Sequence, residues 1–311
     1  MPVFFSILDI YNAIFAQIFK MAETVTTKKN KGRKTTTKPT KKPKKVKENE
    51  MNFWDHLREL RGHLVRSLIA IVLLAIFAFI NKDFVFNSII LAPKDSSFIT
   101  NQLLCKLGML INIDYFCISD YSLNIININM AGQFMTHMYI SFMAGVVMAA
   151  PYIIYQFWKF IEPALYDHEK KNTGSTVIVC STLFITGVSF SYFLIVPLAL
   201  NFFGSYHVSA EVVNQIALSS YISMVVTVTI SIGVVFELPV VIFFLAKAGL
   251  ISIDFLKKNR KYMLVIVLIL SALITPPDVF SQVMVTLPLM ILYEFSILMA
   301  KKAIKKENIK K

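Results

Sequence analysis

The chain has 311 residues, of which 56% are hydrophobic and 16% are charged, and its formal net charge is +13. Soluble globular domains are less apolar and about a quarter of their residues are charged, so this composition excludes an ordinary soluble protein and favours an integral membrane protein. Lysine and arginine gather in a tail and in short loops beside the apolar runs. This distribution indicates membrane orientation and attraction to anionic lipids, and it argues against nucleic-acid binding.

Residues 1–50 precede the apolar part of the chain. Residues 1–20 are apolar with scattered polar groups. They are compatible with a signal peptide, an amphipathic surface helix, or an extension upstream of a true start at Met21, which is the interpretation we favour. Residues 23–50 are rich in Lys, Thr and Pro, so we expect a disordered, basic cytoplasmic tail.

A short amphipathic helix is predicted next. Asn52 can cap it, and Asp55 occupies the position of a capping-box acid. Phe53, Leu57 and Leu60 share one face at helical spacing. We expect this segment to run along the cytoplasmic surface into the first membrane span.

Six apolar runs follow. Crossing the hydrocarbon takes about 20 such residues, and in lipid every backbone polar group must bond within the segment, so the runs are predicted to be helices. The predicted spans are Leu64–Ile80, Met130–Phe157, Thr176–Leu200, Leu218–Ala246, Tyr262–Thr275 and Val279–Ala300. Prolines fall inside these spans at Pro151, Pro197, Pro239 and Pro288. Because each proline removes a backbone donor, we expect an all-α protein whose six helices form a kinked, concave wall.

The fifth predicted span is unusually short. Its apolar run covers about 21 Å at the helical rise, whereas the hydrocarbon is about 30 Å thick. Such a helix must thin the bilayer locally or be sheltered by its neighbours.

Charge asymmetry sets the predicted orientation. Twenty-nine of the 32 Lys and Arg residues fall in alternate segments, on one side of the predicted spans. The positive-inside rule therefore places both termini in the cytoplasm, which an even number of spans satisfies. The other three lie in a long first outward loop, Asn81–Asn129, where we expect short helices or paired strands.

The three cysteines divide by compartment. Cys105 and Cys117 fall in the first outward loop, where they form a candidate disulfide. Cys180 lies in the third span and is expected to be a small buried apolar residue. The sequence has no Cys/His cluster with metal-ligand spacing, no phosphate-binding glycine loop and no nucleophile elbow. It therefore predicts no metal, no cofactor and no enzyme activity.

Four acids are candidates for function. Glu237 lies well inside the fourth span, and Glu294 lies nearer the surface in the sixth. A carboxylate in lipid is costly, so each is a functional hypothesis, with a protonated, packed side chain as the alternative. Glu59 and Glu169 lie at the inward surface, where a lone acid is usually a solvated charge or a helix-pair partner. From these residues alone, a proton-coupled secondary transporter using Glu237 is one hypothesis; the missing catalytic constellation counts against a membrane enzyme.

Four segments carry motifs in a fixed order. They are HLRELR at His56–Arg61, FIEPALYDHE at Phe160–Glu169, FELP at Phe236–Pro239 and TPPDVFSQ at Thr275–Gln282. Together they resemble the HLxELR, F-x-x-P-x-L-x-x-x-E, F-E-x-P and TPPDxxSQ motifs of TatC, the multi-spanning subunit of the twin-arginine translocase. The resemblance covers about residues 51–300. It departs from the family at Glu162, where a small residue is common.

The resemblance implies a six-span membrane domain over residues 51–300, followed by a basic cytoplasmic tail, 301–311. It also implies a non-catalytic receptor in the cytoplasmic (inner) membrane that binds twin-arginine signal peptides. Such a receptor assembles with TatA- and TatB-like single-span proteins and with further copies of itself. It exports folded proteins by using the proton-motive force.

Site residues follow from the same resemblance. Glu59 and Glu169 match the family's signal-binding acids, and an arginine guanidinium can pair bidentately with a carboxylate. The implied signal-peptide site further comprises Arg61, Phe160 and Leu165. The implied intramembrane surface for a partner helix comprises Glu237, Glu294, Gln282 and Asp278.

Overall fold

The structure is a computed structural model that describes residues 53–95, 97–111, 124–162, 173–206, 209, 214–247, 249–275 and 279–308. The predicted tail and its neighbour Asn52 lie outside these residues. The chain divides into two compact units, Met1–Leu68 and Ile69–Lys311, each of which is described by itself. Helix α2 (Phe53–Ile80) supplies the described part of the first unit and continues into the second.

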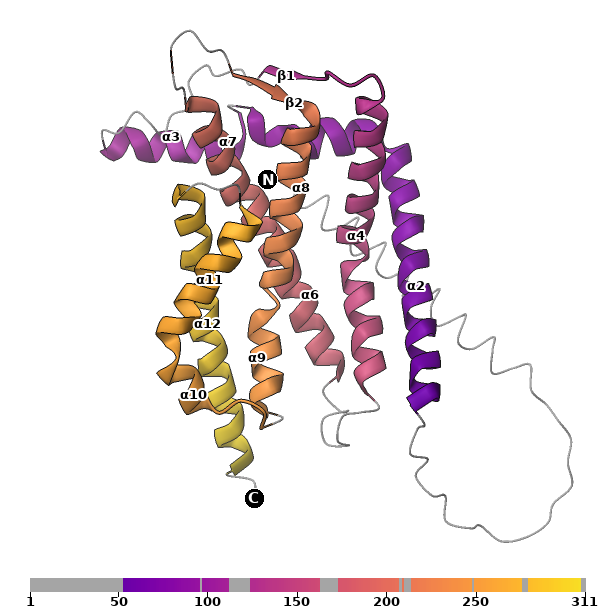
Figure 1. The fold of residues 1–311 in the computed structure, drawn as a ribbon, viewed down its shortest axis with the longest axis vertical. Helices are drawn as coiled ribbons and strands as arrows, with labels where there is room; N and C mark the ends of the chain where they lie inside the picture. The colour runs from indigo at the N-terminus through magenta and orange to yellow at the C-terminus, as the bar shows by residue number, and fades with distance from the viewer. Residues whose placement is uncertain are drawn as a thin grey trace, which may run out of the picture. The chain divides into compact units, whose positions relative to one another are not determined.

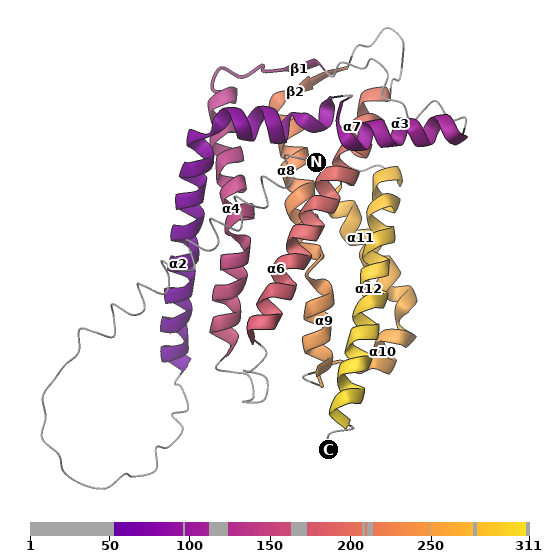
Figure 2. The same cartoon turned by 180° about the vertical axis from the view of Figure 1, so that it is seen from behind.

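The described part of the second unit is built almost entirely from helices (Figures 1 and 2). After α2 its elements are η1 (Phe84–Ile90), η2 (Ala92–Lys94), α3 (Ile99–Ile111), β1 (Asn124–Ile126), α4 (Gly132–Ile161), α6 (Thr173–Phe190), η5 (Ser191–Ile195), α7 (Val196–Ser205), β2 (Gln215–Ala217), α8 (Leu218–Val235), α9 (Leu238–Lys247), α10 (Ile253–Lys258), α11 (Arg260–Ile274) and α12 (Val279–Asn308). Both views show α3 and the two strands at one end of the long helices and α10 at the opposite end. The predicted helical class is confirmed.

Five helical stretches are long and apolar enough to cross a membrane. They are Leu57–Ile80, Gly132–Ile161, Gly174–Ser205, Leu218–Lys247 and Gln282–Lys302. Each overlaps a predicted span, which confirms a multi-pass helical membrane protein. The remaining predicted span corresponds to α11, which has 15 residues, whereas crossing takes about 20. The count of six and the inward termini therefore stay predictions.

Pro239 breaks the fourth predicted span. Because proline has no N–H, Pro239 cannot donate to the carbonyl of Val235, the last residue of α8. The chain turns tightly there, with the N–H of Glu237 donating to the Val234 carbonyl at 3.1 Å before α9 begins. Pro197 likewise follows the π-helical turn η5, whereas α4 and α12 continue through their internal prolines. Interruptions thus occur at two of the four prolines, and the concave shape stays a prediction.

Glycines set the closest approaches between helices. A Cβ added at Gly145 on α4 would lie 2.7 Å from the Ala75 nitrogen and 2.8 Å from the Ile71 carbonyl oxygen, both backbone atoms of α2. A Cβ at Gly187 on α6 would lie 2.7 Å from the Phe236 ring and 3.0 Å from an α8 backbone atom. Small residues are favoured at such places in membrane proteins because they let helix backbones pack in contact.

Short elements at one end of the long helices form a cap, which we define as η1, η2, α3, β1 and β2. Strands β1 and β2 pair in parallel, with Asn124 opposite Gln215 and Ile126 opposite Ala217. The first outward loop thus holds short helices and a strand, as expected. Its strand pairs with a segment more distant in the sequence, which precedes α8.

Tyrosine hydroxyls fasten the cap to the long helices. Pro93 cannot donate to the Ile89 carbonyl four residues earlier, and that carbonyl accepts instead from the Tyr192 hydroxyl at 2.7 Å. Next to it, the Ile90 carbonyl accepts from the Tyr221 hydroxyl at 2.8 Å. Backbone acceptors left free at the end of η1 are therefore satisfied by side chains of η5 and α8.

Helix α3 is anchored in a similar way. Pro197 cannot donate to the Phe193 carbonyl, which accepts from the hydroxyl of Thr100 in the first turn of α3. Asn101 is 2% exposed and donates to the Pro93 carbonyl at 3.1 Å. Specific hydrogen bonds therefore hold the cap in place on the long helices.

Two of the three cysteines lie among the described residues. Cys105 on α3 is disulfide-bonded, and Cys180 is free and buried. Cys117 lies outside the described residues, so the Cys105–Cys117 pairing stays a prediction.

Replacing Tyr221 with phenylalanine is expected to lower the stability by about 1–3 kcal/mol, the usual cost of leaving a buried acceptor without a donor. Tyr221 is 1% exposed, so water cannot take the place of its hydroxyl at the Ile90 carbonyl. Thermal unfolding of the purified protein in detergent measures the change. The control is Tyr206→Phe, at a residue that is 61% exposed, and it should leave the midpoint unchanged. An unchanged midpoint for Tyr221→Phe would contradict the assigned bond energy.

Candidate functional site

The residues of the implied signal-peptide site are described only in part. On α2, in the first unit, Glu59 is partly buried and Arg61 is exposed. Phe160 is partly buried in the last turn of α4, in the second unit. Glu169 and Leu165 lie outside the described residues. The joint action of these residues therefore stays a prediction.

Glu237 lies at the break between α8 and α9. The preceding residue, Phe236, is 5% exposed, and its ring packs on α6, where its centroid lies 5.6 Å from that of Phe190. The tight turn that Pro239 imposes therefore carries Glu237 to the contact between α6 and α8. A local rule, the missing N–H of proline, thus positions a carboxylate inside the predicted fourth span.

The Glu237 side chain lies beside buried residues of two other helices. Cys180 of α6 is next to the Glu237 carboxyl group, and Trp158 of α4 is next to Cys180. Cys180 is 3% and Trp158 is 8% exposed, and the Trp158 ring packs on Phe244 of α9 with centroids 4.5 Å apart. Among the described residues, no side chain or backbone group donates to Oε1 of Glu237. Glu237 therefore lies close to α6 and has one carboxyl oxygen to which no described group donates.

The lack of a donor at Oε1 of Glu237 has an energetic consequence. An unpaired polar atom away from water costs free energy, and a carboxylate within a membrane costs more. A donor brought by another molecule would relieve that cost. Glu237 is partly exposed as a residue, whereas its Oε1 is buried within the described chain.

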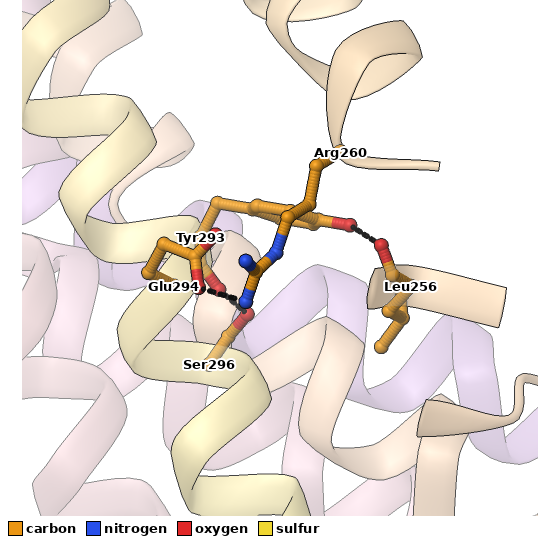
Figure 3. A network of polar contacts seen from close by, with 5 residues as sticks. All are labelled: Leu256, Arg260, Tyr293, Glu294 and Ser296. Atoms are coloured by element: carbon orange, nitrogen blue, oxygen red, sulfur yellow. Dashed lines mark hydrogen bonds and ion pairs between the residues drawn. The ribbon is translucent and has the colours of Figure 1, made fainter. Parts of the chain in front are cut away.

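Glu294 has a partner within the chain (Figure 3). Its Oε2 lies 2.9 Å from Nη2 of Arg260, the first residue of α11, and the two side chains are 41% and 52% exposed. The neighbouring Tyr293 hydroxyl donates to the Leu256 carbonyl of α10 at 2.9 Å, and Ser296 donates to the Tyr293 carbonyl at 2.6 Å. Glu294 therefore helps to hold α11 against α12, while Tyr293 holds α10.

Gln282 also bonds within the chain. Its amide donates to the Leu268 carbonyl of α11 at 3.0 Å. One turn further along α12, the hydroxyls of Thr286 and Ser271 lie 2.9 Å apart in a buried contact. These bonds join α11 to α12. Asp278, which the motif adds to the partner surface, lies outside the described residues.

Several of these partners could not be found from local spacing. Trp158 and Cys180 carry no individual signal for contact with Glu237, and Arg260 is 34 residues from Glu294. A weak signal does exist for the contact between α11 and α12. Ser271 and Thr286 are hydroxyl residues inside apolar runs, where interhelical hydrogen bonding is common.

The sequence matches a known family over most of its length. The profile described as Sec-independent protein translocase protein (TatC) matches residues 55–288. The chain belongs to the TatC family. Its TatC relatives include the protein of Blattabacterium sp. subsp. Periplaneta americana, which is 41% identical over 81% of this chain and 96% of its own length. TatCy of Bacillus subtilis is 34% identical over 84% of this chain and 93% of its own length.

Solved structures of TatC share the fold. A crystal structure of the twin arginine translocase receptor TatC has a TM-score of 0.61 and 33% identity, and it covers 80% of this chain and 99% of its own. A second structure of that receptor in DDM has a TM-score of 0.62 and 34% identity, with 79% and 99% covered. This TatC-family chain is therefore a component of a Sec-independent protein translocase, with a role in transport.

Proposed function

We propose that this TatC-family chain is the receptor for twin-arginine signal peptides, and that Glu59 and Glu169 hold the two arginines. The observation that carries the proposal is the presence of both motif acids in a chain that is similar to solved twin arginine translocase receptors. The chemistry agrees, because two guanidinium groups call for two carboxylates and each pair can form two parallel charge-assisted hydrogen bonds. Arg61, Phe160 and Leu165 complete the proposed peptide site.

The proposed orientation places both termini in the cytoplasm and six helices across the cytoplasmic (inner) membrane. The charge distribution supports it, since α4, α9 and α10 all carry lysine in their last turns. Figures 1 and 2 show these helix ends on the side away from the cap. The positive-inside rule makes that side cytoplasmic.

Export in this proposal needs partners. TatA- and TatB-like single-span proteins bind the intramembrane surface around Glu237, a partly exposed residue whose carboxyl group can accept a hydrogen bond from a polar side chain of the partner helix. Several copies of the chain assemble in the receptor complex. The complex moves folded proteins across the membrane by using the proton-motive force.

Binding of a signal peptide tests the proposal. A peptide with paired arginines should bind the purified chain and a paired-lysine peptide should bind poorly, because lysine cannot form the bidentate pair. Glu59→Gln and Glu169→Gln should each weaken binding roughly tenfold, since a charge-assisted hydrogen bond contributes about 1.5–3 kcal/mol. The matched control is Glu162→Gln, at a partly buried acid just after α4. Unchanged affinity in the Glu59/Glu169 double variant would refute the assignment.

A proton-coupled carrier is the alternative function. It would bind a small solute in the absence of any signal peptide, and that binding would depend on Glu237. The named relatives are translocase components, which favours the receptor. Isothermal titration with arginine-pair peptide in one arm and candidate solutes in the other separates the two functions.

A further inference from the structure

Three exposed lysines lie together at the end of the molecule that is opposite the cap. We define this basic corner as Lys257 and Lys258 on α10 and Lys261 on α11, all of which are exposed. Two acids lie near them. Asp254 is in the first turn of α10, and Glu294 is already paired with Arg260 at 2.9 Å. The Glu294 charge is therefore matched by arginine, and the positive charge of the basic corner outweighs that of Asp254.

The corner is held in a fixed place. Leu256, in the middle of α10, is 5% exposed and packs with Ile242, Tyr293 and Ile297 of α9 and α12. The Leu256 carbonyl accepts from the Tyr293 hydroxyl at 2.9 Å (Figure 3), and Ser252 caps the start of α10. The lysines of α10 therefore stand at the level of Tyr293 and Glu294 along α12.

That level is deep for charged groups. Helix α12 continues to the exposed pair Lys301 and Lys302, which lie about 10 Å further along the helix axis than Glu294 at the helical rise. Helix α11 is short, with 15 residues, and so spans only about 22 Å of a hydrocarbon layer about 30 Å thick. A bilayer matched to the apolar stretch Gln282–Lys302 of α12 would surround the basic corner with acyl chains.

Helix α11 packs on α12 through one face, and its opposite face is not covered by the described part of the chain. Its exposed apolar side chains are Leu264, Val265, Ile266, Ile269 and Leu273, each at least 41% exposed. Placing three ammonium groups among acyl chains is costly, which favours lipid headgroups that reach down to them beside α11.

We propose that the basic corner binds the phosphate groups of anionic phospholipids, so that the bilayer is thinned and anchored beside α11. Each lysine is a compact, mobile donor suited to phosphate oxygens. Two aromatic side chains flank the corner, Phe255 at 58% and Tyr262 at 60% exposure, and the Lys261 Nζ lies 5.6 Å from the Tyr262 ring centroid. Aromatic rings of this kind favour the boundary between headgroups and acyl chains. The site selects lipid by the negative charge of the headgroup and by its depth in the bilayer. Signal-peptide binding does not require this site.

Lipid retention by the full chain tests the proposal. The purified protein is exchanged into mixed micelles that contain dioleoylphosphatidylglycerol or dioleoylphosphatidylcholine, and the bound lipid is counted by native mass spectrometry. The parent chain should retain phosphatidylglycerol in preference to phosphatidylcholine. K257Q/K258Q/K261Q should retain phosphatidylglycerol at least tenfold less, and K257R/K258R/K261R should retain it as the parent does.

A variant with the same change in net charge distinguishes a specific lipid-binding site from general attraction between the protein and anionic lipids. K82Q/K94Q/K106Q removes the same charge from the first outward loop and should leave lipid retention unchanged. An equal loss in this control, or equal retention of the two lipids by the parent chain, would overturn the proposal. So would displacement of bound phosphatidylglycerol by millimolar inorganic phosphate, because the site would then be one for free phosphate. Peptide binding in the same variants should be unchanged, which keeps this test apart from that of the receptor function.

Discussion

Replacing Gly145 with alanine is expected to destabilise the protein by roughly 1–3 kcal/mol, the range for overpacked sites. The effect should lie toward the upper end, because the added Cβ would meet backbone atoms, 2.7 Å from the Ala75 nitrogen and 2.8 Å from the Ile71 carbonyl oxygen. A side chain can rotate away from a clash, whereas the α2 backbone can only move as part of its helix. Separation of α2 from α4 should therefore accompany the loss of stability.

Thermal unfolding in detergent and crosslinking between cysteines placed on α2 and α4 measure these two effects. The control is Gly174→Ala on α6, where an added Cβ has no atom within 4 Å. Alanine favours a helix over glycine by about 1 kcal/mol, so the control should be neutral or slightly stabilising. Parent-like stability of Gly145→Ala would mean that the two helices are less closely packed than described.

Replacing Glu237 with alanine is expected to reduce both crosslinking of a partner helix at α8–α9 and export, while signal-peptide binding survives. The Glu237 Oε1 has no donor among the described residues, and alanine removes the whole carboxyl group. An interhelical hydrogen bond in a membrane contributes about 0.6–2 kcal/mol, which corresponds to a roughly threefold to thirtyfold weaker association. Glu237→Gln keeps an acceptor oxygen and should be milder.

Asp254→Asn serves as the control for Glu237, because Asp254 is an exposed acid in the first turn of α10 and is not part of the proposed partner surface. It should leave partner crosslinking at α8–α9 unchanged. If Glu237→Ala abolished peptide binding in folded protein but left crosslinking intact, the proposed separation of a surface signal site from an intramembrane assembly site would be wrong.

Hydrophobic length and proline chemistry made much of the fold predictable. Apolar runs of about 20 residues reveal spans because the bilayer sets a length, and the five long helices all overlap predicted ones. The break at Pro239 follows from a missing donor, which is a local property. The shortness of α11 could also be predicted from the sequence, because the charged residues Arg260 and Lys261 come immediately before its apolar run and limit the length of that run.

Contacts between distant segments were not predictable from a single sequence. The pairing of Arg260 with Glu294, and the proximity of Trp158, Cys180 and Glu237, depend on how whole helices pack. Spacing rules reach only a few residues along a helix. The candidate acids could be recognised because a carboxylate in an apolar run is rare. The residues next to them in the sequence did not indicate which side chains they contact.

The parallel pairing of β1 with β2 also constrains the order in which the chain can assemble. Parallel neighbours need a long crossover connection, and here that connection contains α4, α6, η5 and α7. The hydroxyl of Tyr221 likewise reaches a carbonyl 131 residues earlier. Synthesis begins at the N-terminus, so β1 is made before β2. Strand β1 therefore stays unpaired until β2, which precedes α8, has been synthesised and placed at the same end of the long helices. Closure of the cap is a late event in biogenesis, and it reports that the helices between the two strands have been inserted.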